Sequence, residues 1–298
     1  MTVIDIEGKF NDNSYLIDTR LMNQEKNLAH YVVENDGMRL MIDIGISSIP
    51  ARKMVKRMKD MGIYPIHKII LTHSHWDHMQ GVEIIKKLMK ETDIEIMASE
   101  KALNSLRNPN IINDVFKNDF FKFSLTPTDD VIPLKEGDII DLNGLKLEIL
   151  NFFGHTPDCI AVFDEKNRNI FVGDAIIGVI GNSPFLPPFM PPTFSEEALL
   201  TTYQKLRNMK NKLNSISLGH FGVLTDEDFN RVIDEMEEFY FKVKDSIIKW
   251  YHENPSIESI TSKYIKTIIA NPDIPVEMFK MPVGWLVKGL EMSGFIEN

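Results

Sequence analysis

The sequence predicts an α/β fold in which two mixed β-sheets are covered by helices, with an all-helical extension at the C-terminal end. Two observations lead to this prediction. In residues 1–224, short runs of β-branched and aliphatic residues alternate with amphipathic segments and tight turns. In residues 225–298 the apolar residues recur at helical spacing instead. We therefore divide the chain into a domain at 1–224 and a helical extension at 225–298.

Turn and helix-ending residues mark the elements of the first domain. Asn143-Gly144 is the strongest hairpin signal, and Asp36-Gly37 marks an earlier turn. Gly62 ends a helix whose methionines recur at helical spacing. The predicted strands are 31–33, 40–42, 69–71, 94–98, 138–142, 145–150, 160–163, 170–172 and 216–218. The predicted helices are 50–61, 81–90 and one that begins near Ser99.

Helical periodicity continues through the extension. Three helices are predicted at 225–253, 257–269 and 283–292, with Asn254-Pro255 separating the first two because a residue before proline disfavours the helical conformation. Before the extension, residues 182–192 hold five prolines together with Phe185 and Phe189. Such a restricted segment either walls a pocket or crosses the surface.

Composition and charge exclude several classes of protein. The 298 residues include 33 Lys plus Arg and 43 Asp plus Glu, which gives a net charge of −10. Cys159 is the only cysteine, so no intrachain disulfide can form. The first ten residues lack the basic and apolar regions of a signal peptide, and no apolar run is long enough to span a bilayer. We therefore expect a soluble, cytoplasmic protein without a membrane partner.

The strongest chemical signal is a cluster of metal-binding residue types directly after the strand at 69–71. Within Thr72-His73-Ser74-His75-Trp76-Asp77-His78, three imidazoles and one carboxylate can converge from a single loop. Imidazole and carboxylate together suit zinc, iron, manganese or cobalt. The alternative is a solvated loop in which Ser74 and Asp77 cap a helix.

Three later motifs favour the metal site. Gly154-His155-Thr156 follows one predicted strand, Gly173-Asp174-Ala175 follows a second, and Gly219-His220-Phe221-Gly222 follows a third. Each motif offers one ligand at the carboxyl end of a strand, where loops commonly build functional sites. The ordered set is a much stronger signal than any one motif alone.

In this order the motifs resemble the metallo-β-lactamase-fold hydrolases over residues 1 to about 224. The resemblance implies an αββα sandwich with a dinuclear centre at one edge. It implies two divalent metal ions, with zinc preferred and iron or manganese as alternatives. It also implies a first metal held by His73, His75 and His155, a second held by Asp77, His78 and His220, and Asp174 bridging the two.

The chemistry implied by the resemblance is hydrolysis by a metal-bridging hydroxide. Two neighbouring metals lower the pKa of bound water and stabilise charge on the attacked group. Asp77 is the predicted catalytic residue, which orients the nucleophile or passes a proton to the leaving group. Because the metals bring more positive charge than Asp77, Asp174 and the hydroxide return, the site accepts an anionic small-molecule substrate despite the acidic chain.

Residues beside the motifs have less specific interpretations. Asp43 resembles the family's early strand-end aspartate and either orients a ligand histidine or forms a turn. Trp76 is a candidate pocket wall, and His30, His67 and His252 are interpreted as structural or solvated. Cys159 is interpreted as a small buried residue rather than a redox or nucleophilic group.

Departures from the family pattern narrow the substrate class. No C-terminal Arg/Lys pattern resembles the glutathione site of glyoxalase II enzymes. Asp158 stands where the commoner family form has glycine, which is similar to a quinolone-signal response thioesterase that also has a helical extension. The resemblance to the glyoxalase II, lactonase and thioesterase-like branch implies hydrolysis of an ester, thioester or lactone of a small molecule.

Three alternatives remain open. Persulfide dioxygenases, which use mononuclear iron, often have a cysteine at the position of Cys159. Relatives with a winged-helix-like C-terminus end similarly to residues 283–296, and some are ribonucleases, so a metal-dependent phosphodiesterase or ribonuclease is the second alternative. A non-catalytic regulator that keeps the metals is the third.

The extension holds 8 basic and 14 acidic side chains, which argues against a nucleic-acid partner. We expect it to pack over the site or to form a homodimer contact.

Overall fold

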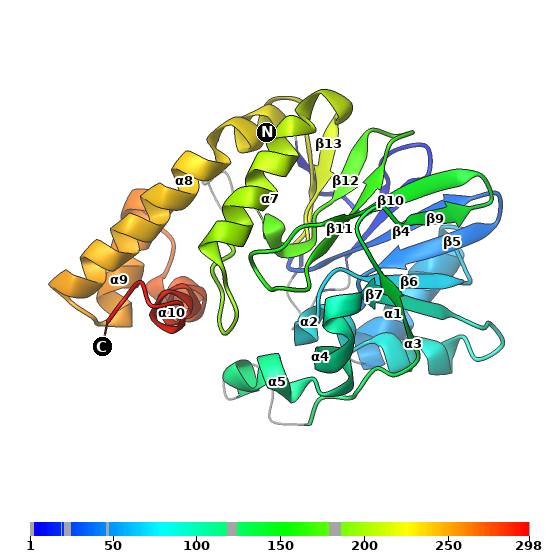
Figure 1. The fold of residues 1–298 in the computed structure, drawn as a ribbon, viewed down its shortest axis with the longest axis horizontal. Coiled ribbons are helices and arrows are strands. Elements are labelled where there is room, and N and C mark those ends of the chain that lie inside the picture. The colour runs from blue at the N-terminus through cyan, green and yellow to red at the C-terminus, as the bar shows by residue number, and fades with distance from the viewer. Residues whose placement is uncertain are drawn as a thin grey trace.

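The computed structural model describes residues 3–18, 20, 25–45, 48–117, 124–178 and 186–297, with only the backbone described for 48–50. Two β-sheets pack face to face, helices cover their outer faces, and the last helices lie at one end of the molecule (Figure 1). This layer order confirms the predicted αββα sandwich of two mixed sheets followed by C-terminal helices.

The N-terminal sheet has, within the described residues, the strand order β2-β3-β4-β5-β6-β7-β8. Neighbours are antiparallel as far as β5 and parallel from β5 to β8. The strands are β2 (Gly8–Lys9), β3 (Ser14–Asp18), β4 (Ala29–Asn35), β5 (Met38–Ile42), β6 (Lys68–Leu71), β7 (Glu95–Ser99) and β8 (Val131–Leu134).

The C-terminal sheet has, over the same described residues, the order β1-β14-β13-β12-β11-β10-β9. Only β12 and β13 are parallel among its described pairs. The strands are β1 (Val3–Ile4), β9 (Ile139–Leu142), β10 (Leu145–Asn151), β11 (Ile160–Asp164), β12 (Asn169–Phe171), β13 (Ser215–Ser217) and β14 (Val223–Thr225). The predicted hairpin at Asn143-Gly144 joins β9 to β10, with both residues in the left-handed region.

An apolar layer holds the two sheets together. Buried side chains from β3, β4 and β5 meet those of β9 to β12 and β14 in one cluster. Tyr31 adds a polar link, because its hydroxyl donates to the carbonyls of Leu218 (2.8 Å) and Gly222 (2.9 Å) across the layer. The link fixes the loop after β13 against β4, and this loop carries His220.

Short helices cover the N-terminal sheet. A second cluster joins β6 and β7 to α1 and α3, which carry the helical methionine and aliphatic patterns of the sequence. The elements on this side are α1 (Ser48–Asp60), α2 (Trp76–Met79), α3 (Val82–Leu88), η2 (Glu100–Ala102), α4 (Leu103–Arg107), α5 (Asn110–Asn113) and η3 (Asp114–Phe116).

The largest apolar cluster lies on the other face and continues into the extension. It joins the C-terminal sheet to α7 and α8 and then to the last helices. The elements on this side are η4 (Gly173–Ala175), α7 (Glu196–Asn208), η5 (Lys210–Lys212), α8 (Asp226–Glu253), α9 (Ile257–Tyr264), η6 (Ile265–Ile269) and α10 (Val276–Met292). The division at 224/225 stays a prediction.

The last helix differs from the sequence-based expectation. It begins at Val276, seven residues before the predicted start at 283, and continues through Pro282. A proline inside a helix removes one backbone hydrogen bond. Burial of Val283, Leu286 and Leu290 in the large cluster offsets that loss here. Local propensity was therefore outweighed by tertiary packing.

Two further expectations concern the proline-rich segment 182–192 and a membrane-spanning helix. Phe185 lies outside the described residues, whereas Phe189 is fully buried against Phe194 and Tyr240. No helix among the described residues is long and apolar enough to cross a membrane.

Candidate metal centre

The seven predicted ligands lie on four loops that follow strands. His73 and His75 follow β6, and Asp77 and His78 lie on the short helix α2, for which His75 is the N-cap. The other three follow β10, β12 and β13 and are His155, Asp174 and His220. The structure therefore brings all seven side chains to one edge of the sandwich.

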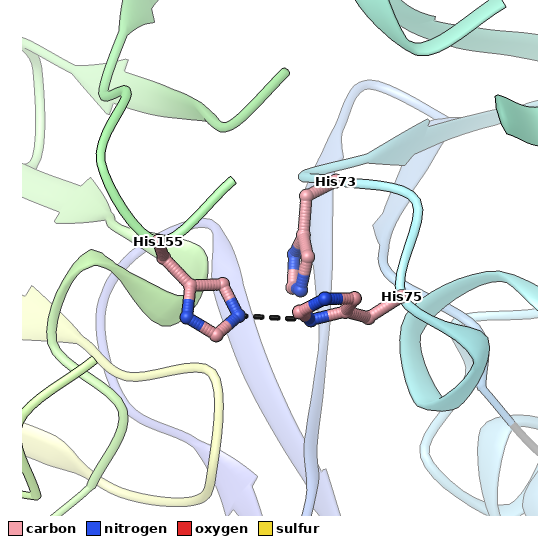
Figure 2. A group of neighbouring side chains, drawn as sticks. All are labelled: His73, His75 and His155. Carbon is pink, nitrogen blue, oxygen red and sulfur yellow. Dashed lines mark hydrogen bonds between the residues drawn. The ribbon is translucent and has the colours of Figure 1, made fainter. Parts of the chain in front are cut away.

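Three imidazoles form the inner group, defined as His73, His75 and His155 (Figure 2). All three are buried. Nε2 of His155 lies 2.9 Å from Nδ1 of His75, and the His73 ring faces both (Figure 2). Two imidazole nitrogens that face each other at this distance share either a proton or a metal ion.

The outer group consists of Asp77, His78 and His220. Oδ2 of Asp77 lies 3.9 Å from Nε2 of His78 and 3.6 Å from Nε2 of His220. The His78 side chain is fully buried, but the side chains of Asp77 and His220 are 16% and 23% exposed. Solvent therefore reaches the outer group.

Asp174 lies between the two groups. Its Oδ2 is 3.5 Å from Nε2 of His155 and 3.3 Å from Nε2 of His220, and its Oδ1 is 3.4 Å from Nε2 of His78. This position depends on Gly219, because a Cβ there would lie 2.2 Å from Asp174 Oδ1. The glycine of the Gly-His-x-Gly motif therefore makes room for the carboxylate.

Outer hydrogen bonds orient four of the five imidazoles. Nδ1 of His78 donates to Asp43 Oδ2 (2.8 Å), Nδ1 of His155 to the Pro188 carbonyl (2.8 Å) and Nδ1 of His220 to the Asn27 carbonyl (2.9 Å). The Thr72 hydroxyl donates to Asp43 (2.8 Å), so it accepts from Nδ1 of His73 (3.1 Å). Each Nε2 is thereby left with its lone pair towards Asp174.

The residues present fit metal ions. The buried atoms His73 Nε2, His78 Nε2 and Asp174 Oδ1 have no hydrogen-bond partner. Lone pairs and carboxylates that face one another need positive charge between them, supplied by protons on the histidines or by cations. Distances of 3.3–3.5 Å from Asp174 to three Nε2 atoms also match the ligand–ligand edge of about 3.4 Å in a tetrahedral zinc site.

The two groups differ in their electrostatics. Burial lowers the pKa of His73, His75 and His155, so these rings are neutral and ready to coordinate. Burial acts in the same direction on His78 and His220, but nearby carboxylates outweigh it and raise the pKa of both: Asp174, Asp43 and Asp77 at His78, and Asp174 and Asp77 at His220. Burial would raise the pKa of Asp174, yet His78 and His220 hold it well below its usual range.

Three residues that support the metal loop were not predicted to do so. Asn113, fully buried, donates from Nδ2 to the Ser74 carbonyl (3.0 Å) and accepts from the Trp76 amide (2.8 Å). The Ser74 hydroxyl donates to Asp158 (2.6 Å), and the Phe116 ring packs on His75. Asp158 could have been noticed because it stands where the commoner family form has glycine, but no local sequence pattern marks Asn113 or Phe116 as a support of the loop.

The remaining histidines and the cysteine lie outside the two groups. His30 is buried, with Nε2 unpartnered, and burial lowers its pKa to about 4. His67 accepts the Arg39 amide (3.1 Å), and His252 is exposed in the last turn of α8. Cys159 is buried beside the Thr156 hydroxyl (3.0 Å), and burial raises the pKa of its thiol well above the usual range.

Comparison with known proteins identifies a family over the part of the chain that contains all seven predicted ligands. The family described as the Metallo-beta-lactamase superfamily matches residues 30–220. The hydroxyacylglutathione hydrolase GloC of Haemophilus influenzae is 26% identical over 140 residues, which are 45% of this chain and 61% of the relative. An atrochrysone carboxyl ACP thioesterase of Emericella nidulans is 25% identical over 158 residues, 52% of this chain and 42% of the relative. The chain therefore spans about half the length of these two relatives.

A solved structure extends the likeness to nearly the whole fold. A metallo-beta-lactamase family protein from Thermus thermophilus superposes with a TM-score of 0.65 at 15% identity. The superposition covers 94% of this chain and 92% of the other. At this identity the likeness concerns the fold alone.

Proposed function

The chain belongs to the metallo-beta-lactamase superfamily, and from this premise we propose that it is a metal-dependent hydrolase acting on an ester, thioester or lactone of a small molecule. The observation that carries the proposal is the Asp174 carboxylate, placed 3.3–3.5 Å from one imidazole nitrogen of the inner group and two of the outer group. One carboxylate shared by two ligand groups is the arrangement that a dinuclear centre requires.

We assign one ion to each group. His73, His75 and His155 would hold the first ion, Asp77, His78 and His220 the second, and Asp174 would contact both. Imidazole and carboxylate donors suit zinc first, with iron or manganese as alternatives. Such ions lower the pKa of a bound water and stabilise negative charge that develops on the attacked group.

The chain's own residues position and move protons around this reaction. Asp43, Thr72 and the Pro188 carbonyl hold three of the imidazoles in one tautomer, so the ligands need no reorganisation when an ion binds. Asp77 is the acidic residue of the outer group that solvent reaches. We propose that Asp77 orients the nucleophile or passes a proton to the leaving group.

The names of the relatives and the charge of the extension bear on the choice between a carbonyl substrate and a phosphodiester, and the charge decides it. The two relatives named above are called a hydrolase and a thioesterase, which supports the carbonyl substrate, whereas an exodeoxyribonuclease of Bacillus anthracis, 24% identical over 159 residues, supports the phosphodiester alternative. The extension is acidic, which opposes phosphate backbones, so we propose a small molecule rather than a nucleic acid as the partner. An anionic substrate is compatible because the two ions set the local charge.

Metal analysis combined with a substrate panel tests the proposal. The purified chain is assayed for ions per chain and for cleavage of an ester, a thioester, a lactone and a phosphodiester, with and without oxygen. We expect about two ions per chain and hydrolysis of a carbonyl substrate at a rate that oxygen removal leaves unchanged. One iron per chain with oxygen consumed on a persulfide, cleavage of the phosphodiester alone, or turnover of no substrate would each overturn it.

A further inference from the structure

We propose that helix α10 of the C-terminal extension is a positioning element of the inner group, acting on His155 through Gly289 and on His75 through Trp285. This inference deepens the proposed function and rests on it, because it concerns the same metal centre. The helix lies wholly outside residues 30–220, the part of the chain that matches the family. The contacts that lead to it are independent at the two histidines.

The first contact is between the backbones of two segments. A Cβ at Gly289 would lie 2.1 Å from the Phe189 carbonyl oxygen and 2.9 Å from the Phe189 carbonyl carbon. No side chain fits at that distance, so only glycine lets α10 touch this segment. The neighbouring Pro188 carbonyl accepts from Nδ1 of His155 at 2.8 Å and from the Met190 amide at 2.8 Å. A shift of residues 188–190 would therefore move the acceptor that orients His155.

The second contact is a series of aromatic rings. Trp285 lies one turn before Gly289, on the same face of α10. Its ring meets Phe116 edge to face, with centroids 5.4 Å apart at 78°. Phe116 in turn meets His75 edge to face, with centroids 5.4 Å apart at 85°. The His75 ring thus packs against Phe116, and Phe116 packs against Trp285, which belongs to the extension.

The helix is itself firmly fixed, so it can act as a support. Val283, Leu286 and Leu290 are fully buried in the large apolar cluster, and α10 packs against α8 and α9 (Figure 1). A partly buried charge pair joins α8 to α7, because the Lys244 ammonium and the Tyr240 hydroxyl both bond to Glu196. Two of the three inner imidazoles, His155 and His75, are therefore supported by α10, a helix that is not part of the ligand-bearing loops.

Two glycines of the same helix provide a matched test. Gly289 meets the Phe189 backbone, whereas a Cβ at Gly284 would meet only Ile257 Cγ2 at an ordinary 3.7 Å. The variants G289A and G284A add the same methyl group to the interior of the same helix. If α10 served only for general packing, the two variants would not differ in metal binding.

The readouts are Co²⁺ titration of the metal-free protein, followed by the visible spectrum of the bound ion, and equilibrium unfolding of the metal-free protein. We expect G284A to match the parent in Co²⁺ affinity and in the visible spectrum of the bound ion. We expect G289A to bind its first Co²⁺ about 10–100-fold more weakly, the usual effect of disturbing a ligand's outer partner, with an altered spectrum. Equal affinity and an unchanged spectrum in G289A would overturn the action on His155.

Variants at Trp285 test the second contact and decide the case if G289A does not fold. Trp285→Ala is expected to weaken Co²⁺ binding, and Trp285→Phe, which keeps an aromatic edge against Phe116, to restore most of it. Val283→Ala, buried on the same helix, is the control for lost packing. It should lower the unfolding midpoint and leave Co²⁺ affinity unchanged. A Co²⁺ affinity in Trp285→Ala equal to the parent's would overturn the action on His75.

The proposed function and this inference fail in different ways. If the parent chain binds no Co²⁺, the proposed metal centre itself is wrong. If the parent binds Co²⁺ normally and the G289A and Trp285→Ala variants do as well, the centre stands and only the role of α10 is wrong.

Discussion

The inner and outer ligand groups contrast in burial and in charge. Every imidazole of the inner group is buried, and burial lowers its pKa. In the outer group Asp77 and His220 are partly exposed, and carboxylates raise the pKa of its two imidazoles despite burial. One half of the centre thus consists of neutral, buried imidazoles, and the other combines two imidazoles of raised pKa, of which His78 is buried and His220 is partly exposed.

From this difference we expect the inner group and the outer group to have different roles in metal binding and reaction. A cage of neutral, preoriented imidazoles binds an ion without first losing protons, so we expect the inner ion to be held more tightly. The outer group has the solvent access that a reaction with water needs, and it contains Asp77, the proposed proton carrier. The predictions below test this contrast, and the first one removes the residue that the two halves share.

Replacing Asp174 by alanine should have the largest effect. The carboxylate is expected to hold both ions, so Asp174→Ala should lower the metal content below two ions per chain. Activity should fall on the order of 10³-fold, because several kcal/mol of charge stabilisation are lost. Elemental analysis and initial rates on the best panel substrate measure both effects.

The matched control for this variant is Asp164→Ala. Asp164 is also a buried aspartate next to a turn, on β11, but it bonds to Asn167 and lies outside both groups. It should keep two ions. Retained activity and two ions in Asp174→Ala would contradict the bridging role.

Replacing Asp43 should affect the outer group most. Asp43 accepts from Nδ1 of His78 and from the amide and hydroxyl of Thr72. Asp43→Ala should weaken binding of the more loosely held ion by about 10–100-fold. The more tightly held ion should be affected less, since Asp43 reaches the inner group indirectly, through the Thr72 hydroxyl that accepts from His73. Stepwise Zn²⁺ titration separates the two constants, and an equal loss at both would show that the halves are not independent.

Acidification should remove the two ions in a defined order. The raised pKa of His78 and His220 lets protons compete with the outer ion at higher pH, whereas the lowered pKa of His73 and His75 delays competition at the inner group. Dialysis at decreasing pH, followed by metal analysis, should pass through a state with one ion per chain. Loss of both ions in a single step would count against the contrast.

The smallest effect is expected at Cys159, the buried thiol that lies four residues after His155. Burial raises the pKa of this thiol, so it is not a nucleophile at neutral pH. Cys159→Ala should leave the rate within about twofold of the parent and cost about 1 kcal/mol in unfolding free energy. A large loss of rate with an intact metal content would give the thiol a chemical role.

Much of the fold could be predicted because its signals are local. The Asn143-Gly144 hairpin, the methionine-rich helix α1 and the long helix α8 all follow from turn chemistry or periodicity within a short window. Strands with little local signal were not predicted. β1 and β2 have two residues each, and they exist because the neighbouring strands β14 and β3 provide hydrogen-bond partners.

The start of α10 and the support of the metal loop could not be predicted for a related reason. Pro282 indicates a helix that begins after it, and only burial of the neighbouring apolar residues shows otherwise. Asn113 holds the loop from 37 residues away, and nothing around it in the sequence marks that contact.

By itself, the sequence determined which ligand types are present and that each follows a strand, since imidazole and carboxylate chemistry belongs to single residues. Only the tertiary structure decided that Asp174 lies between the two groups and that Gly289 and Trp285 stand behind the inner one. Those relations depend on distances of a few ångströms between segments about 20 to 170 residues apart, and such distances are set by how the sheets and helices pack.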